Sequence, residues 1–330
     1  MIASIASVTD VRPPPAGPDL PSVALIGAGA MGQHHARVVH ESPMARLGVV
    51  IDADRHRARE LARRLDAPFT TDCSAAADHD AAIVASPTET HVDIGVDLLK
   101  RGISVLVEKP LAPHLDGAEQ LVDAARVAEG ALMCGFVERF NPAFIAATGL
   151  LTQNPIHIVA VRHSPAAPRI RTSVVHDLLI HDIDLVLQLA APGDEVVEVS
   201  GHVSDPLGRG VADIADCVLR FRSGLIATLS ASRASHRKLR DLQINDAEHL
   251  IDVDLLRQNV DVYRHVRHEL VGSNASYREE TVHDIPFVRR PGEPLALQFD
   301  HFVALMSGAA DRGAELDRLL PAHEVTSRLP

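Results

Sequence analysis

Three groups of residues in this sequence have types and spacings that suit chemistry. The first is the run GAGAMG at residues 27–32, which has G-x-G-x-x-G spacing. The second is Lys109 in the sequence E-K-P, and the third is the pair Asp177 and His181, four residues apart. On a helix, that spacing brings a carboxylate within reach of an imidazole, which would raise the basicity of the ring and fix its orientation.

The residues around the glycine run predict a dinucleotide-binding turn. The apolar run Ser22–Ile26 predicts a strand, and residues 33–41 have helical spacing. Glycines at this spacing allow a tight turn and close approach to a pyrophosphate, which would meet the helix N-terminus. Asp52 ends the next apolar run, where such a fold needs an acid for the ribose hydroxyls. The plain structural alternatives are an unliganded turn and an N-cap at Asp52.

The alternation of short apolar runs with helical segments continues to residue 107. Helices are predicted at Arg55–Leu65 and His91–Lys100, and strands at 81–85 and 104–107. This order is typical of a parallel sheet with right-handed crossovers. The segments 86–91 and 108–110 follow two of these strands, and ligands bind at the carboxyl ends of such sheets. We therefore expect Lys109 to face a ligand, although a single lysine is ordinarily a solvated surface residue.

The second half of the chain predicts an antiparallel sheet. Strand-like runs cover 156–163, 196–203, 216–221, 225–232 and 240–245, and no long helix separates most of them. We place the domain boundary near residues 141–142, with a returning contribution from a helix at 295–306. The expected organisation is a flexible Pro-rich tail at 1–21, an NAD(P)-binding domain at 22–140 and an α+β substrate and oligomerisation domain at 141–330. The fold class is α/β.

Composition argues against several classes of protein. The formal charge is −12, from 32 Lys plus Arg and 44 Asp plus Glu, which disfavours a nucleic-acid partner. Three scattered cysteines indicate neither a disulfide framework nor a zinc knuckle, and the 19 histidines show no metal-ligand spacing. No apolar run is long enough for a membrane helix, and the N-terminus does not read as a signal peptide. We therefore expect no metal, no membrane and a cytoplasmic location.

Five motifs, in order, resemble one known family. GAGAMG, SPTETH, VLVEKPLA, GFVERFNPAF and HDLLIHDIDL are similar to motifs of the glucose-fructose oxidoreductase, inositol dehydrogenase and MocA (Gfo/Idh/MocA) family of NAD(P)-dependent dehydrogenases, over residues 22 to about 305. The resemblance implies a Rossmann domain followed by a domain whose open antiparallel sheet often forms an oligomer interface. It also implies hydride transfer between a nicotinamide and a secondary alcohol or ketone, with Lys109, Asp177 and His181 as catalytic residues.

The resemblance assigns further residues to the site. Besides Lys109, the residues expected to bind the cofactor are Gly27, Gly29, Ala30, Met31, Gly32, Asp52, Ser86, Pro87, Thr88, His91 and Glu108. Those expected to contact substrate are Arg139, Asn141, Arg169 and Arg171.

Within the family the likeness is to UDP-N-acetylglucosamine 3-dehydrogenase-like members, which predicts a nucleotide-linked sugar as substrate. Arg162, Arg169 and Arg171 would supply charge for its diphosphate. Arg233 belongs to a second basic cluster, which we interpret as a solvated loop. Two departures stand out: Thr172-Ser173-Val174 replaces the branch's D-V-G, and PAHEVTSRLP replaces the closing helix.

Several alternatives stay open. An NADPH-dependent keto- or imine-reductase would need a basic pocket in place of Asp52, and Arg55 and Arg57 are near enough to keep that reading; Asp52 itself favours NAD over NADP. An inositol or free-sugar dehydrogenase and a non-catalytic cofactor-binding regulator are the others. We expect a homodimer or homotetramer built through the C-terminal sheet, with apolar area from Val218, Phe221, Ile226 and Leu229.

Overall fold

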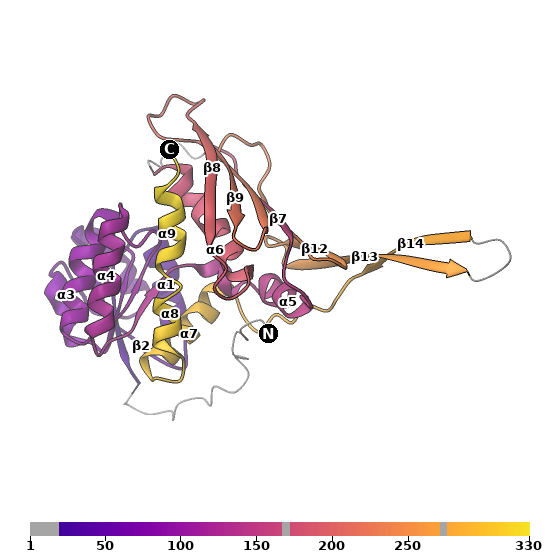
Figure 1. Ribbon diagram of the computed structural model, residues 1–330. Coiled ribbons are helices and arrows are strands. Elements are labelled where there is room, and N and C mark those ends of the chain that lie inside the picture. Colours follow the sequence, from indigo (N-terminus) through magenta and orange to yellow (C-terminus); the bar gives the residue numbers. More distant parts are fainter. Residues whose placement is uncertain (1–19, 167–171, 271–275) are drawn as a thin grey trace. The chain divides into compact units, whose positions relative to one another are not determined.

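The computed structural model describes residues 20–166, 172–270 and 276–330 (Figure 1). These form two compact units. Of the described residues, the first contains 20–137 together with 292–327, and the second contains those within 138–291 together with 328–330. The return to the first unit is therefore longer than the single helix expected at 295–306.

The first unit is built on a six-stranded parallel sheet in the order β3-β2-β1-β4-β5-β6. Its strands are β1 (Ser22–Ile26), β2 (Arg46–Ile51), β3 (Phe69–Thr70), β4 (Ala81–Val84), β5 (Ser104–Val107) and β6 (Leu132–Cys134). Every residue of β1, β4 and β5 is buried. Strands covered on both faces need apolar side chains in both directions, which explains their unbroken apolar sequences.

Helices connect these strands and pack on the sheet. They are α1 (Ala30–Glu41), α2 (Arg55–Arg64), α3 (His91–Lys100) and α4 (Leu115–Val127), with 3₁₀ turns at Cys73–Asp78 and Thr88–Thr90. The returning segment adds α7 (Pro294–Met306), α8 (Arg312–Leu316) and α9 (Leu320–Ser327), and α9 packs on α4.

The closing helix is present, so our reading of PAHEVTSRLP as its loss is wrong. Pro321 stands in the first turn of α9, where the missing N–H of proline costs no hydrogen bond. Ala322, His323 and Val325 are then buried. A proline at the start of a helix is compatible with the turns that follow it.

The second unit contains an eight-stranded sheet in the order β14-β13-β12-β11-β7-β10-β9-β8. All of its neighbours are antiparallel except β7 and β10. The strands are β7 (His157–His163), β8 (Val196–Ser204), β9 (Ile214–Phe221), β10 (Ile226–Ser232), β11 (Leu239–Asn245), β12 (His249–Asp254), β13 (Asn259–Leu270) and β14 (Ser276–Asp284). In Figure 1 the β13–β14 hairpin extends as a two-stranded ribbon beyond the other strands. The α/β class and the mainly antiparallel second sheet are confirmed.

The helices of the second unit are α5 (Pro142–Leu150) and α6 (Ile180–Leu189), with a 3₁₀ turn at Val137–Phe140 and a π turn at Val175–Leu179. One sheet face is buried and the other open. Leu229 and Phe221 point to the buried face, whereas Ile226 and Val218 are 42% and 40% exposed. The four apolar residues that we expected on a single surface therefore lie on two opposite faces of the sheet, because the side chains of successive strand residues point to alternate faces.

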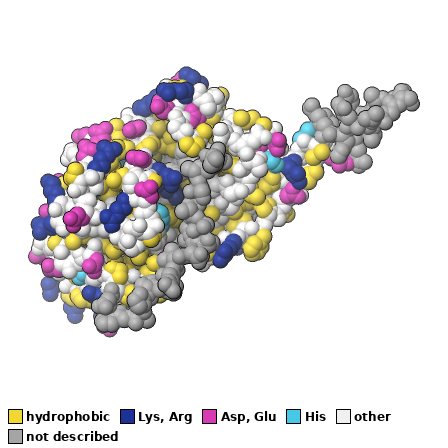
Figure 2. Space-filling model, turned by 60° about the horizontal axis from the view of Figure 1, so that its bottom comes forward, with side chains coloured by type: hydrophobic (Ala, Val, Ile, Leu, Met, Phe, Trp, Pro, Cys, Tyr) yellow, Lys and Arg dark blue, Asp and Glu magenta, His cyan; other side chains and the backbone are white. Residues whose placement is uncertain are grey.

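Acidic and basic side chains are intermixed on the face shown in Figure 2, so the excess of acidic residues is not gathered into one patch there.

Candidate active site

The three glycines of the turn between β1 and α1 have different roles: two are required by the fold, and one borders space that a ligand could occupy. Gly27 has φ +99°, and a Cβ there would lie 2.5 Å from Ala85 O. A Cβ on Gly32 would collide with Gly27 O. Around Gly29, in contrast, a Cβ would meet nothing within 4 Å. The fold therefore requires the outer two glycines, while the middle one leaves open space beside the turn.

That open space lies at the N-terminus of α1. Gly29 is the N-cap and receives no side-chain cap, and the first turn contains no acidic residue. The first-turn N–H groups, including those of Ala30 and Met31, have no acceptor within the helix, and the helix dipole adds positive potential. This end of the helix fits a pyrophosphate.

Asp52 is tied to the same turn. Its Oδ2 accepts a hydrogen bond from Ala28 N at 2.7 Å, and its Oδ1 accepts one from Asp54 N at 2.8 Å. The N-cap of α2 is Asp54 rather than Asp52, so the capping interpretation of Asp52 is wrong. Each oxygen of Asp52 can accept a further hydrogen bond. The carboxylate is thus placed and able to receive ribose hydroxyls.

Arg55 and Arg57, the two arginines near enough in sequence to bind the 2′-phosphate of NADP, each contact another side chain of the protein. The Arg55 guanidinium lies over the Phe69 ring, 5.5 Å from its centroid. Arg57 Nε is 3.4 Å from Asp54 Oδ2.

The loop after β4 is ordered by internal bonds. Ser86 Oγ and Thr90 Oγ1 are 2.7 Å apart, and Thr90 Oγ1 donates to Pro87 O. His91 is 1% exposed, and its ring nitrogens each lie 3.0 Å from a carbonyl, Ser86 O and Pro110 O. We had expected His91 to contact the cofactor directly. Burial instead makes it a link between the loops that follow β4 and β5.

Lys109 lies in the loop after β5, preceded by a buried carboxylate. Glu108 Oε1 is 2.7 Å from His35 Nε2, and Glu108 Oε2 accepts from Lys109 N at 3.2 Å. The Lys109–Pro110 peptide is cis. Leu111 N donates to His323 Nε2 at 3.0 Å. No local pattern in the sequence indicates these roles for His35 and His323, because their partners lie 73 and 212 residues away along the chain.

Asp177 belongs to a π turn rather than to a regular helix. Ile180 N donates to Val175 O, five residues earlier, and α6 begins at Ile180. Single π turns occur often at functional sites. The Asp177 side chain is 24% exposed, and His181, in the first turn of α6, is half-buried.

Arg233 lies behind Asp177 and was not expected there. It is 1% exposed, which corrects its assignment to a solvated basic loop. Arg233 Nη1 is 3.7 Å from Asp177 Oδ2, and Nη2 donates to Thr172 O at 2.5 Å and Ala212 O at 3.1 Å. Arg233 thus holds the carbonyl of Thr172, just before the π turn, and faces the carboxylate of Asp177.

The remaining polar residues of this unit form an internal ion network. Arg139 donates to both oxygens of Asp184, at 2.8 and 2.6 Å, and Asp184 is 2% exposed. Asn141 donates to Glu138 and Leu255 O, and it caps α5 at Ala143 N. We expected Arg139 and Asn141 to contact substrate, but these bonds explain both side chains as parts of the network.

Arg162 is also part of this interior and does not fit our prediction of a diphosphate contact. It is 2% exposed, with Nη1 2.8 Å from Glu138 Oε1 and Nη2 2.7 Å from Asp182 Oδ1. Burial acts to raise the pKa of Glu138, but Arg162 and Arg240 outweigh it and hold that pKa below its ordinary value. Arg169 and Arg171 lie outside the described residues.

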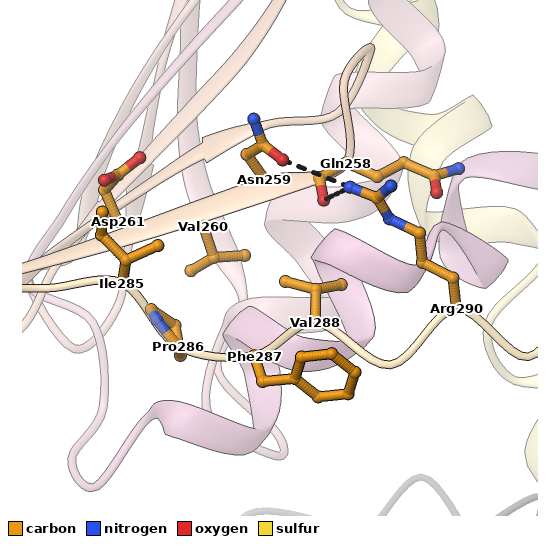
Figure 3. Close-up of a pocket in the computed structure, with 9 residues that line it drawn as sticks. All are labelled: Gln258, Asn259, Val260, Asp261, Ile285, Pro286, Phe287, Val288 and Arg290. Atoms are coloured by element: carbon orange, nitrogen blue, oxygen red, sulfur yellow. Dashed lines mark hydrogen bonds between the residues drawn. The ribbon is translucent and has the colours of Figure 1, made fainter.

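A hollow in the second unit lies between the start of β13 and the segment after β14 (Figure 3). Arg290 Nη2 there donates to Arg257 O, Gln258 O and Asn259 Oδ1. None of the residues proposed for catalysis lines it. Within the described ranges, no three His, Cys, Asp or Glu side chains gather in a way that could hold a metal ion, and none of the helices is both long and apolar enough to cross a membrane.

The fold and the glycine turn define a dinucleotide-binding oxidoreductase with a Rossmann unit. Comparison with known proteins agrees. Residues 22–136 match the model of the oxidoreductase family with an NAD-binding Rossmann fold, and residues 156–278 match the GFO/IDH/MocA C-terminal domain. The chain belongs to the Gfo/Idh/MocA family, and NAD is its cofactor.

Individual relatives are sugar and inositol dehydrogenases. The chain is 30% identical over 241 residues to UDP-N-acetylglucosamine 3-dehydrogenase of Acidithiobacillus ferrooxidans, covering 72% of this chain and 75% of that protein. The solved structure of this enzyme superposes with a TM-score of 0.80 at 26% identity, covering 94% of this chain and 97% of the other. Inositol 2-dehydrogenase of Rhizobium meliloti is 26% identical over 314 residues, covering 88% and 89% of the two chains.

Proposed function

We propose that this protein is an NAD-dependent dehydrogenase that oxidises a secondary alcohol of a nucleotide-linked sugar. The observation that carries the cofactor is the uncapped N-terminus of α1 beside open space at Gly29, with Asp52 bonded to the same turn. The relatives named above support a sugar as the substrate class.

The catalytic roles fall to Lys109, His181 and Asp177. A bound nicotinamide would accept a hydride from the alcohol carbon. We propose that His181 accepts the proton from the hydroxyl and that Lys109 donates a hydrogen bond to the same oxygen, which stabilises its developing negative charge. Asp177 orients these groups. Reduction of the corresponding ketone uses the same groups in reverse.

Replacing Lys109 tests this assignment. Lys109→Ala should leave NADH binding unchanged and lower kcat by roughly 10² or more, as expected when a donor to the transition state is lost. His181→Ala should do the same. We expect the wild-type kcat to rise with pH, and this rise should be absent from His181→Ala. A Lys109→Ala enzyme with normal kcat and a raised KM would show that Lys109 only binds substrate.

The nucleotide on the sugar is supported by the similarity to UDP-N-acetylglucosamine 3-dehydrogenase. Its test is a screen of sugar nucleotides, inositols and free sugars for NAD reduction, followed at 340 nm. Arg169 and Arg171 stay candidates for the diphosphate, and their joint replacement by Ala should narrow the preference for the nucleotide-linked form. Equal turnover of a free hexose or of inositol would reject the nucleotide while leaving the dehydrogenase in place.

We also propose a homo-oligomer, a dimer or tetramer, assembled through the open face of the eight-stranded sheet. That face presents Val218 and Ile226, which are 40% and 42% exposed. The segment after β14, in the same unit, contains two more exposed apolar residues, Ile285 and Phe287, which are 75% and 91% exposed. Side chains this apolar at such exposure are typical of association surfaces. Light scattering at micromolar concentration should give a multiple of the chain mass, and Ile226→Arg should lower it. A monomeric wild-type protein would contradict the proposal.

A further inference from the structure

Three buried histidines surround the short segment that carries Lys109. They come from three helices of the same unit: His35 from α1, His91 from α3 and His323 from α9. Their exposures are 1%, 1% and 5%. Each contacts residues 108–111 through a ring nitrogen, at 2.7, 3.0 and 3.0 Å. We call these residues the histidine clamp.

Two of the rings have tautomers that their partners specify. His35 Nε2 faces a carboxylate oxygen of Glu108 and must donate to it. His323 Nδ1 faces Leu319 O at 2.8 Å, so it is the donor there, which leaves Nε2 free of a proton to accept from Leu111 N. The third ring, His91, has a carbonyl at each nitrogen and can donate to both only as an imidazolium. The clamp therefore makes directional bonds and does not merely fill space.

These contacts help to satisfy the N–H groups of the segment. Glu108 N donates to Val84 O, Lys109 N to the Glu108 carboxylate and Leu111 N to His323, while Pro110 has no N–H. Loops after strands commonly satisfy such groups with water. Here buried side chains do so on either side of Lys109, which fixes the backbone from which its long side chain extends.

We propose that His35, His91 and His323 are positioning residues that hold the backbone of Lys109 in the geometry needed for hydride transfer. The proposal rests on the proposed function for the role of Lys109. His35 lies one turn after Gly32 on the helix whose N-terminus fits the pyrophosphate. Its bond to Glu108 therefore joins the cofactor turn directly to the catalytic segment, and the clamp holds both parts in register.

The composition of the chain allows this placement to be observed without turnover. The whole sequence contains three lysines, Lys100, Lys109 and Lys238. Protein labelled with ¹³C at lysine Cε should give three side-chain signals. A variant with Lys100→Arg and Lys238→Arg should retain the signal of Lys109 alone, which assigns it.

The test variants are His35→Gln and His323→Gln, each of which keeps a polar side chain of moderate size. Each should move the Lys109 signal and leave those of Lys100 and Lys238 in place. In the same proteins kcat should fall about tenfold or more, since small misplacement of a reacting group is costly, while KM and the NADH Kd change less than about threefold. His79→Gln is the control, because His79 bonds Ser22 Oγ at the opposite, amino ends of the strands.

The outcomes separate two failures. An unmoved Lys109 signal in folded His35→Gln and His323→Gln proteins overturns the clamp, as does an equal movement in His79→Gln. If the Lys109 signal moves in the variants but the wild-type protein oxidises no sugar, the proposed function is rejected. The inference that the histidines position Lys109 then still stands. Should His35→Gln not fold, Glu108→Gln tests the same contact, because a carboxamide has a single accepting oxygen and cannot accept from both His35 Nε2 and Lys109 N as the carboxylate does.

Discussion

Replacing Gly29 by alanine should separate cofactor binding from folding more cleanly than any other change in the glycine turn. Gly29 has φ −70° and ψ −165°, a conformation that alanine adopts, and an added Cβ would meet no heavy atom within 4 Å. Since alanine restricts the unfolded chain more than glycine does, the free energy of unfolding should stay the same or rise by about 0.4–1 kcal/mol.

The effect on NADH should be the opposite. The new methyl would occupy the space where a pyrophosphate approaches the N–H groups at the start of α1. Hydrogen bonds to charged groups are each worth roughly 1.5–3 kcal/mol, so the loss of two costs at least about 3 kcal/mol. At about 1.4 kcal/mol per factor of ten, the NADH Kd should rise about 150-fold.

NADH fluorescence titration and thermal unfolding of the same samples measure the two quantities. Gly149→Ala is a matched control, because its Cβ also meets nothing within 4 Å and it lies in the other unit; it should leave the NADH Kd unchanged. Gly32→Ala should destabilise the protein itself, since its Cβ collides with Gly27 O. A Gly29→Ala protein that binds NADH within twofold of wild type would refute the pyrophosphate site at this turn.

Three further predictions concern charge and burial. NADP should bind at least about tenfold more weakly than NAD, through repulsion between Asp52 and the 2′-phosphate, and Asp52→Asn should narrow that gap in matched titrations. In a thiol assay at pH 8, exposed Cys73 should react first, although partial burial and the nearby Asp72 and Asp97 raise the pKa of its thiol and slow the reaction. Cys134 and Cys217 should react only on unfolding; burial raises the pKa of Cys217 to about 12, which leaves about 10⁻⁴ of it as thiolate. Arg162→Met should lower the free energy of unfolding by about 3–5 kcal/mol in urea titrations, because the buried carboxylates of Glu138 and Asp182 would lose this cationic partner.

Local pattern was sufficient for much of the first unit. The apolar runs ending at Ile26 and Ile51 became β1 and β2, and the acid that follows the second run does bond to the glycine turn. The two-residue strand β3, Phe69–Thr70, was missed because it is too short to show a period. The parallel pairing of β7 with β10 was also missed, since strand neighbours depend on the path of the whole chain.

The site shows the same division between local and distant signals. Arg162 could have been placed correctly, because it alternates with Ile158 and Ala160 along β7 and so shares their buried face. Arg233 could not, since its contacts with Asp177 and Thr172 join residues some sixty positions apart. An arginine cluster in sequence has the same appearance whether its members meet water or buried carboxylates.

The return of residues 292–327 to the first unit has a consequence for biosynthesis. During translation, all of residues 138–291 are made before α7, α8 and α9, the three helices that complete the first unit. Until then Leu111 N lacks His323, and the surface of α4 that receives α9 is open to solvent. A nascent chain stalled near residue 291 should therefore present a chaperone with an apolar surface on its earliest-made part, and the segment that bears Lys109 should be among the last to become ordered.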